Sequence, residues 1–434
     1  MKKFYLLGIA FFSLVAAKSQ SLEDINEMIS KSQYRDAKAG IEKYLLNPKK
    51  AKDAEAWFYK GVIYNALSKD PTVGQVESYA LKSDAYDAFK MNQTLDPKDI
   101  QMTFQQHIPY LDLYFEFTNL GVKQFNDKNF EGAMNSFKKA NEVKDYIVAK
   151  KYEYEQAKLY PLDTGLVRNI AITAMQASQA TKDSAKIKML EQEEIQYLSK
   201  LIDAKVGGDE FFDVYSTVAE YYLKKNDAAG LSAVVAKGQA IYPKSNYWLE
   251  LEIRSLGEHP EKDQLFKKYE ELIALHPESF YLNYSYAVEL FKTVSGKDLL
   301  TEQDMAQLDK LSAVLRKSIT LEGNDDVASC VLMANHLYRY AYELQNTAKA
   351  IKSVKPDDVK KKTALKDAAN KNIDECLADC NKAVDFIEKA QEKTSLQKAN
   401  YRILLGFMKE IYETKGDKVK MAEVEKKLAV AEKW

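Results

Sequence analysis

Apolar residues recur every three or four positions through most of the chain, the spacing that places them on one face of an α-helix. The first such segment begins at residues 21–24, Ser-Leu-Glu-Asp, where the serine and aspartate are placed to cap each other's backbone amides. Ile25 and Ile29 continue it, and the next segment carries Ala37 and Ile41 on one face. The pattern predicts pairs of helices that follow one another along the chain.

Two longer segments share an arrangement of aromatic, glycine and alanine residues. The residues that carry it are Trp57, Gly61, Tyr64, Ala85, Phe89 and Pro97 in the first segment, and Phe117, Leu120, Gly121, Phe130, Ala133, Phe137 and Ala140 in the second. A glycine lets a partner helix approach closely, and the aromatic rings fill the space between helix pairs. A single pair cannot bury its apolar face alone, so we expect the pairs to stack.

This arrangement resembles the tetratricopeptide repeat family, whose 34-residue unit is a pair of antiparallel helices. Residues 119–143 follow the family pattern without a gap, whereas the segment around Gly61 follows it only with 12 extra residues between its two helices. Tyr242-Pro243 and His276-Pro277 lie 34 residues apart, where the family ends its second helix. The resemblance implies an all-α fold, an α-solenoid of antiparallel hairpins wound into a right-handed superhelix.

The alternation of helix and turn continues from residue 211 to residue 318, and the last third of the chain predicts longer helices. Two are expected over residues 326–354 and 357–393, and a final pair over 395–414 and 418–433. We therefore expect a repeat region over residues 20–296 and a long-helix region over 297–434 that continues or caps the stack.

Residues 1–19 have the three parts of a secretory signal peptide. Residues 1–3 are Met-Lys-Lys, residues 4–17 are apolar, and small residues follow at Ala17 and Ser19. An apolar run of 14 residues is shorter than the roughly 20 that span a bilayer, so we expect cleavage, with a retained anchor as the alternative. Since the first cysteine is Cys330, we expect a periplasmic or secreted protein that is no lipoprotein and has no transmembrane segment after cleavage.

Composition excludes several classes of protein. The 434 residues are 46% hydrophobic, which excludes a disordered chain, and 16 glycines with 9 prolines are too few for the turns of an all-β fold. Lys and Arg total 63 against 64 Asp and Glu, so there is no positive footprint for nucleic acid.

The sequence contains no catalytic, phosphate-binding, dinucleotide-binding, zinc or calcium motif, so we predict no enzymatic activity, no cofactor and no metal site. Cys376 and Cys380 lie on one helical face at a separation too large for a disulfide between them. Three alternatives stay open for the thiols: buried free cysteines, one bridge from Cys330 to either partner, or a metal site.

The leading hypothesis for function is a non-catalytic extracytoplasmic scaffold that binds a protein or peptide of the cell envelope in a concave groove. In the family that this chain resembles, the groove is lined by the first helix of each pair. The candidate groove residues on that basis are Phe58, Asn65, Thr118, Phe125 and Asn126. The 28 tyrosines suit such a surface, because each combines a large contact area with a polar tip.

Two alternatives belong to other classes. The first is a glycan- or nutrient-binding envelope protein similar to the helical starch-binding family, which is usually lipid-anchored and rich in tryptophan; this chain has 3 tryptophans. The second is a glycosidase on an α/α toroid, which needs long glycine-rich loops that carry carboxylates. Sixteen glycines make that architecture the less favoured one.

Overall fold

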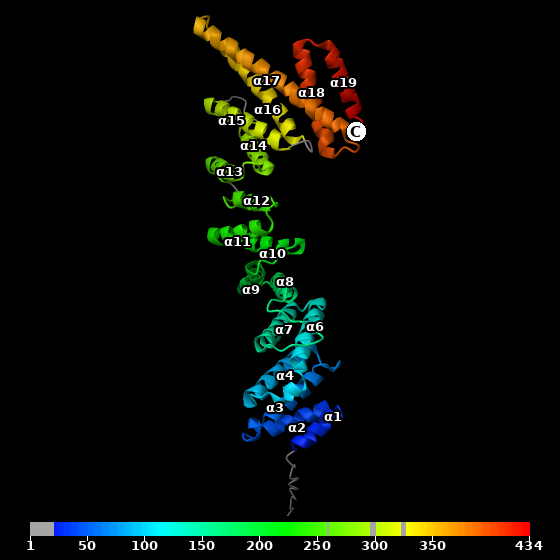
Figure 1. Cartoon of the computed structure of the whole chain (residues 1–434). Helices are drawn as coiled ribbons and strands as arrows, with labels where there is room; N and C mark the ends of the chain where they lie inside the picture. Colours follow the sequence, from blue (N-terminus) through cyan, green and yellow to red (C-terminus); the bar gives the residue numbers. More distant parts are fainter. Residues whose placement is uncertain (1–20, 258–259, 296–300, 323–326) are drawn as a thin grey trace, which may run out of the picture. The chain divides into compact units, whose positions relative to one another are not determined.

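The computed structural model of the chain describes residues 21–257, 260–295, 301–322 and 327–434 (Figure 1). Within these ranges the regular structure is entirely helical, with nineteen α-helices and two short 3-10 helices. The predicted all-α fold of consecutive helical pairs is confirmed, and the hand of the superhelix stays a prediction. The predicted signal peptide and the predicted boundary between residues 296 and 297 lie outside the described residues.

The chain forms two compact units, one up to Pro243 and one from Lys244 onward. The first contains α1 (Leu22–Ser30), α2 (Tyr34–Leu45), η1 (Lys50–Lys52), α3 (Ala54–Leu67), α4 (Gln75–Leu95), α5 (Ile100–Phe104), α6 (Ile108–Asn126), α7 (Phe130–Lys150), α8 (Thr164–Ala180), α9 (Ser184–Asp203), η2 (Asp209–Phe211), α10 (Phe212–Lys224) and α11 (Ala228–Ile241). The second contains α12 (Tyr247–Arg254), α13 (Lys262–Leu275), α14 (Phe280–Val294), α15 (Glu302–Glu322), α16 (Ala328–Ala350), α17 (Pro356–Lys389), α18 (Ser395–Lys415) and α19 (Lys418–Ala431).

Neighbouring helices pack as hairpins, among them α3 with α4, α6 with α7, α8 with α9, α16 with α17 and α18 with α19. Local sequence sets where the helices begin. Ser21 accepts from the Asp24 amide while the Asp24 carboxylate accepts from the Ser21 amide, which is the predicted capping box. Thr301 and Asp304 cap the start of α15 in the same way, also as predicted.

The predicted 34-residue period is visible in the backbone around α11 and α13. Tyr242 ends α11 with φ −123° and ψ 63°, and His276 ends α13 with φ −130° and ψ 62°. Each donates its amide to the carbonyl four residues earlier at 2.8 Å, and each precedes a proline that stops the helix. Two helix ends that lie 34 residues apart are therefore the same structure.

Gly61 and Gly121 lie where the sequence pattern required close approach. A Cβ atom on Gly61 would lie 2.3–2.7 Å from ring atoms of Phe89, and one on Gly121 would lie 2.7–3.0 Å from those of Phe137. In both hairpins a phenylalanine of the second helix thus covers a glycine of the first. This contact is equivalent in the two hairpins, although its residues are 28 apart in one and 16 apart in the other.

Each unit has its own hydrophobic core. One cluster of buried residues runs from Ile25 to Leu190, and another runs from Leu249 to Ala431. The predicted long helices of the last third are confirmed as α16 to α19. The helices α8 and α9 were not predicted.

The three cysteines, Cys330, Cys376 and Cys380, are buried free thiols, which is the first of the three alternatives. Cys376 donates to the Ala334 carbonyl at 3.2 Å, and its sulfur lies 4.0 Å from that of Cys380. No group of three or more potential metal ligands occurs in the described ranges. Among the same residues, no helix combines the length and apolar character needed to cross a membrane.

Candidate functional site

The 12 extra residues of the first aromatic repeat build a pocket. They lengthen the connection over residues 68–74 and the first two turns of α4, while the glycine–phenylalanine contact keeps the rest of the hairpin in register. We call the result the insertion pocket, with a volume of about 290 Å³. It is lined by Ser68, Lys69, Asp70, Pro71, Val73, Gln75, Ser78 and Lys82 from the insertion and α4, and by Glu116, Asn119, Leu120 and Lys123 from α6.

A buried ammonium group lies among the residues of this pocket. Lys82 is 2% exposed, and its Nζ lies 3.0 Å from the Ser68 hydroxyl, 3.2 Å from the Ser78 hydroxyl and 3.3 Å from a carboxylate oxygen of Glu116. Burial lowers the pKa of Lys82, while the Glu116 carboxylate acts in the opposite direction. The polar partners compensate for the desolvation of the charge, so the site is built around this side chain.

One face of α6 borders the insertion pocket and is exposed. Phe115, Thr118, Asn119, Val122 and Asn126 recur at helical spacing, and we call them the α6 face. Phe115 is 45% exposed and Val122 is 46% exposed, which is high for large apolar side chains. Asn119 belongs to both the face and the pocket, so the two form one continuous surface.

Of the predicted groove residues, Thr118 and Asn126 lie on the α6 face, although the Thr118 hydroxyl donates to the carbonyl of Tyr114 at 2.8 Å. Asn65 is buried one turn before the pocket residue Lys69. Both donate to the same carboxylate oxygen of Asp112 at 2.6 Å, which ties α3 to α6.

The other two candidates, Phe58 and Phe125, belong to the core. Phe58 is buried with its ring 6.0 Å from that of Phe89, and the half-buried Phe125 packs its ring 5.5 Å from that of Phe130. The structure therefore brings three of the five predicted residues to α6 or the helix packed on it. It places the two aromatic ones mainly between helices.

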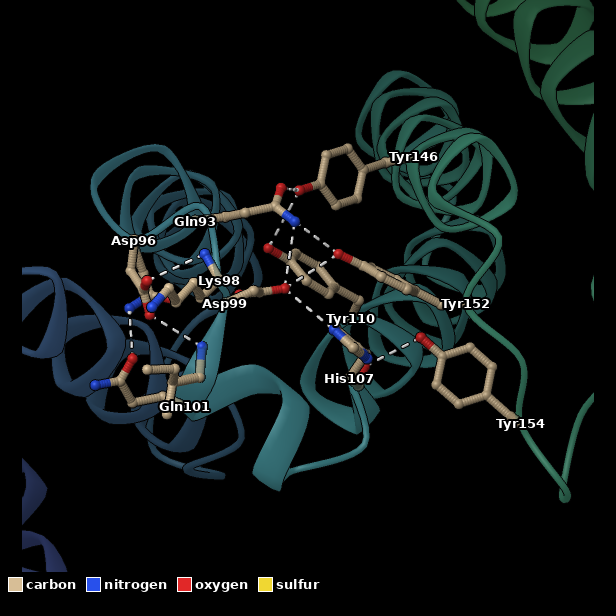
Figure 2. Close-up of polar contacts among 12 residues, drawn as sticks. Gln93, Asp96, Lys98, Asp99, Gln101, His107, Tyr110, Tyr146, Tyr152 and Tyr154 are labelled. Carbon is tan, nitrogen blue, oxygen red and sulfur yellow. Dashed lines mark hydrogen bonds and ion pairs between the residues drawn. The ribbon is translucent and has the colours of Figure 1, made fainter.

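A second group of functional side chains lies where the connection from α4 to α6 meets the segment that follows α7. Figure 2 shows Gln93 between two tyrosines: its amide oxygen accepts from Tyr146, and its nitrogen donates to Tyr152 at 2.7 Å. Tyr152 donates to the carboxylate of Asp99 at 3.2 Å, and Nε2 of His107 lies 3.1 Å from the same oxygen. We call this group the tyrosine network.

The tyrosine network fastens backbone in an uncommon conformation. Asp99 has φ 54° and His107 has φ 56°, the left-handed region that non-glycine residues seldom adopt. The His107 carbonyl accepts from Tyr154 at 3.0 Å, so side chains beyond α7 hold the end of this connection. Burial raises the pKa values of Tyr110, Tyr146 and Tyr152, which keeps the three phenols protonated as donors.

An aspartate–histidine–tyrosine group also occurs in enzymes, and its geometry here favours a structural role. The rings of His107 and Tyr152 are stacked with centroids 3.7 Å apart, so no substrate fits between them. Asp99 is 6% exposed and bonded to three side chains. The arrangement fixes two connections against each other.

Neither group could be found from the repeat pattern alone. The pattern identified the insertion only as a departure in length, and it placed no chemistry there. In the sequence, the one signal for the pocket is a lysine, Lys82, at a position of α4 that lies one turn before the buried Ala85 and Tyr86.

The fold and these sites define an all-α protein of tandem helical hairpins. No protein-family model matches the sequence, and no curated protein matches it. Among solved structures, the chain is similar to the crystal structure of the APC/C hetero-tetramer Cut9–Hcn1 (11% identity, 95% of this chain and 88% of that chain covered, TM-score 0.22). It is also similar to the structure of Naa15/Naa10 bound to HypK-THB (11% identity, 95% and 93% covered, TM-score 0.20).

A third similar structure is a circular tandem repeat protein with a novel repeat topology (8% identity, 95% of this chain and 87% of that chain covered, TM-score 0.22). TM-scores of this size do not define a common fold. The class of the protein therefore rests on its own helices and on the two equivalent glycine–phenylalanine contacts.

Proposed function

We propose that this protein is a non-catalytic scaffold that binds a protein or peptide at the insertion pocket and the adjoining α6 face. The observation that carries the proposal is the continuity of the two. Exposed apolar side chains at Phe115 and Val122 lie beside a polar pocket whose buried Lys82 is already in place. A surface of rigid helices loses little conformational entropy on association, because its side chains are positioned before the partner arrives.

The test is site-specific crosslinking in cells. A photoreactive amino acid at Asn119, which borders both pocket and face, is expected to capture a partner. The same amino acid at Met189, an exposed apolar residue of α9 that is 52% exposed, is the matched control. Phe115→Asp is expected to abolish the crosslink from position 119, because it places a charge in the apolar contact. Equal capture from both positions, or capture unaffected by Phe115→Asp, would contradict the proposal.

We also propose that the protein acts outside the cytoplasm. Support comes from the sequence of residues 1–19, with its cationic start, apolar run and small residues at Ala17 and Ser19. The expected result is a mature protein that begins at or near Gln20 and fractionates with the periplasm or the medium. N-terminal sequencing of the protein from fractionated cells decides this. A cytoplasmic protein that retains Met1 would refute it.

A further inference from the structure

A pocket in the second unit lies among three helices, far in sequence from the surface discussed above. Tyr338, Tyr342 and Gln345 recur at spacings of four and three along α16 and therefore share one face. Asn370 and Ile373 line it from α17, and Thr414 lines it from α18. Its volume is about 290 Å³, at the small end of the range for ligand sites in proteins.

Two aromatic rings give the pocket an apolar side. Tyr342 is 58% exposed, so much of its ring is open to solvent. Tyr338 is held in place from behind, because its ring stacks on Phe407 with centroids 5.0 Å apart and its hydroxyl donates to Glu410. Ile373 and the buried Ile411 extend this apolar side. The rings are thus positioned before any ligand binds.

The polar side of the pocket is neutral and has free hydrogen-bonding capacity. Among the described residues, neither Gln345 nor Asn370 has a side-chain hydrogen-bond partner, so both amides retain their donors and acceptors. Lys415 at the rim is paired with the carboxylate of Asp374, and Glu410 is bonded to Tyr338. The lining therefore offers amide groups, and its charged groups are already paired.

We propose that this pocket binds one neutral sugar residue. A pyranose ring presents C–H groups on its faces and hydroxyl groups at its edge. The C–H groups match the electron-rich face of the Tyr342 ring, and the hydroxyls match the two amides, each of which donates and accepts. The site is separate from the insertion pocket, so it does not depend on the proposed scaffold function.

The same lining argues against charged ligands. An acidic sugar or a phosphate needs an available cation, whereas the rim lysine is engaged by Asp374. A cationic ligand needs an available carboxylate, and Glu410 accepts from Tyr338. A proline-containing peptide is the main competitor, since it too combines an apolar ring with amide groups, and the experiment includes it.

The experiment is saturation-transfer NMR on the full chain, with methyl glycosides of glucose, galactose, mannose and N-acetylglucosamine as probes. Each is used at about 10 mM, because a single sugar on one ring is expected to bind in the millimolar range. Methyl glucuronide and N-acetylprolinamide are the acidic and the peptide probes. We expect transfer to at least one neutral glycoside, strongest at the ring C–H protons, and little to the other two probes.

Two variants connect the signal to the pocket. Tyr342→Ala removes the ring face, and Asn370→Ala removes one amide; both side chains are exposed, so both variants are expected to fold. Each is expected to weaken binding at least about fivefold, whereas Tyr160→Ala, an exposed tyrosine of the first unit, leaves it unchanged. The proposal is overturned if no neutral glycoside binds, if binding survives Tyr342→Ala, or if only glucuronide or the prolinamide binds.

Discussion

At the scale of single residues, missing atoms determine the packing of the first unit. The ring of Phe89 occupies the space above Gly61, and the ring of Phe137 occupies the space above Gly121. A methyl group at either glycine would overlap a buried ring, which is held by its neighbours and has little room to move. The close approach of α3 to α4 and of α6 to α7 therefore depends on these two positions.

Gly61→Ala is expected to destabilise the first unit by about 1–3 kcal/mol, because its Cβ requires the Phe89 ring to move. The matched control is Gly406→Ala in the interior of α18, where nothing lies within 4 Å of the added Cβ. That change is expected to stabilise its helix by about 0.5–1 kcal/mol. Urea unfolding followed by circular dichroism measures both, and a stabilising Gly61→Ala would refute the packing account.

His336 makes the stability of the second unit depend on pH. Its ring is buried, Nε2 lies 2.6 Å from the Ser312 hydroxyl, and Nδ1 has no partner among the described residues. Burial, assisted by the charge of Arg316, lowers its pKa from 6.5 to about 4. The folded state thus favours the neutral ring. The stabilisation is complete above pH 6.5 and is lost as the pH falls toward 4, a change on the order of 3 kcal/mol.

The variant His336→Gln is expected to lose less stability than the wild type between pH 7 and pH 5. Burial raises the pKa of Asp379 to about 6 and gives an opposite slope, which the comparison of the two proteins cancels. The exposed His276, changed to Gln, serves as the control and should keep the wild-type slope. Urea midpoints at the two pH values measure the effect, and parallel slopes for all three proteins would contradict it.

Residue-scale prediction from the sequence succeeded where a residue type has one physical reason. A glycine opposite a phenylalanine is such a case, and so is the capping pair at Ser21 and Asp24. It was less informative for Phe58 and Phe125, because an aromatic residue in a helix serves a core as well as a groove. Burial decides between these roles, and it depends on helices that are distant in sequence.

At the scale of elements, the connections are as well determined as the helices. The segment between α4 and α6 contains two left-handed residues, Asp99 and His107, and the tyrosine network holds both. Such backbone costs on the order of 1 kcal/mol or more per residue, so it persists only where surrounding contacts fix it. The network thereby sets where α6 begins, and with it the position of the α6 face.

Tyr152→Phe is expected to loosen the segment after α7. The change keeps the ring stacked on His107 but removes the hydroxyl that accepts from Gln93 and donates to Asp99. We expect a loss of about 1–2 kcal/mol and faster tryptic cleavage at Lys150 and Lys151. Tyr160→Phe, at an exposed position in the same segment, is the control. Equal cleavage of the two variants would show that the network does not hold the segment.

The helices α8 and α9 show why some elements were missed. In α8 the buried positions are filled by residues such as Leu166, Ile170, Ala174 and Ala177. These residues follow a helical period but contain neither the glycine nor the aromatic residues that marked the two earlier hairpins. A search for the repeat pattern passes over such a pair, although its packing in the stack is the same in kind.

At the scale of the whole molecule, the described residues form two cores that share no member. Residues 20–243 are therefore expected to fold without the rest of the chain, with a helical circular dichroism spectrum and a cooperative urea transition. Gly61→Ala should shift that transition in the fragment as it does in the full chain, and Gly406→Ala serves as the control in the full chain. A fragment without a cooperative transition would show that the first core is incomplete.

The insertion of 12 residues has a consequence for how such a chain can change over evolutionary time. It entered at the turn end of one hairpin and left the glycine–phenylalanine lock below it intact. A lineage can therefore remodel the turn ends of its hairpins while the locks preserve the architecture. New recognition properties would then accumulate at those ends and leave the stacked interior conserved.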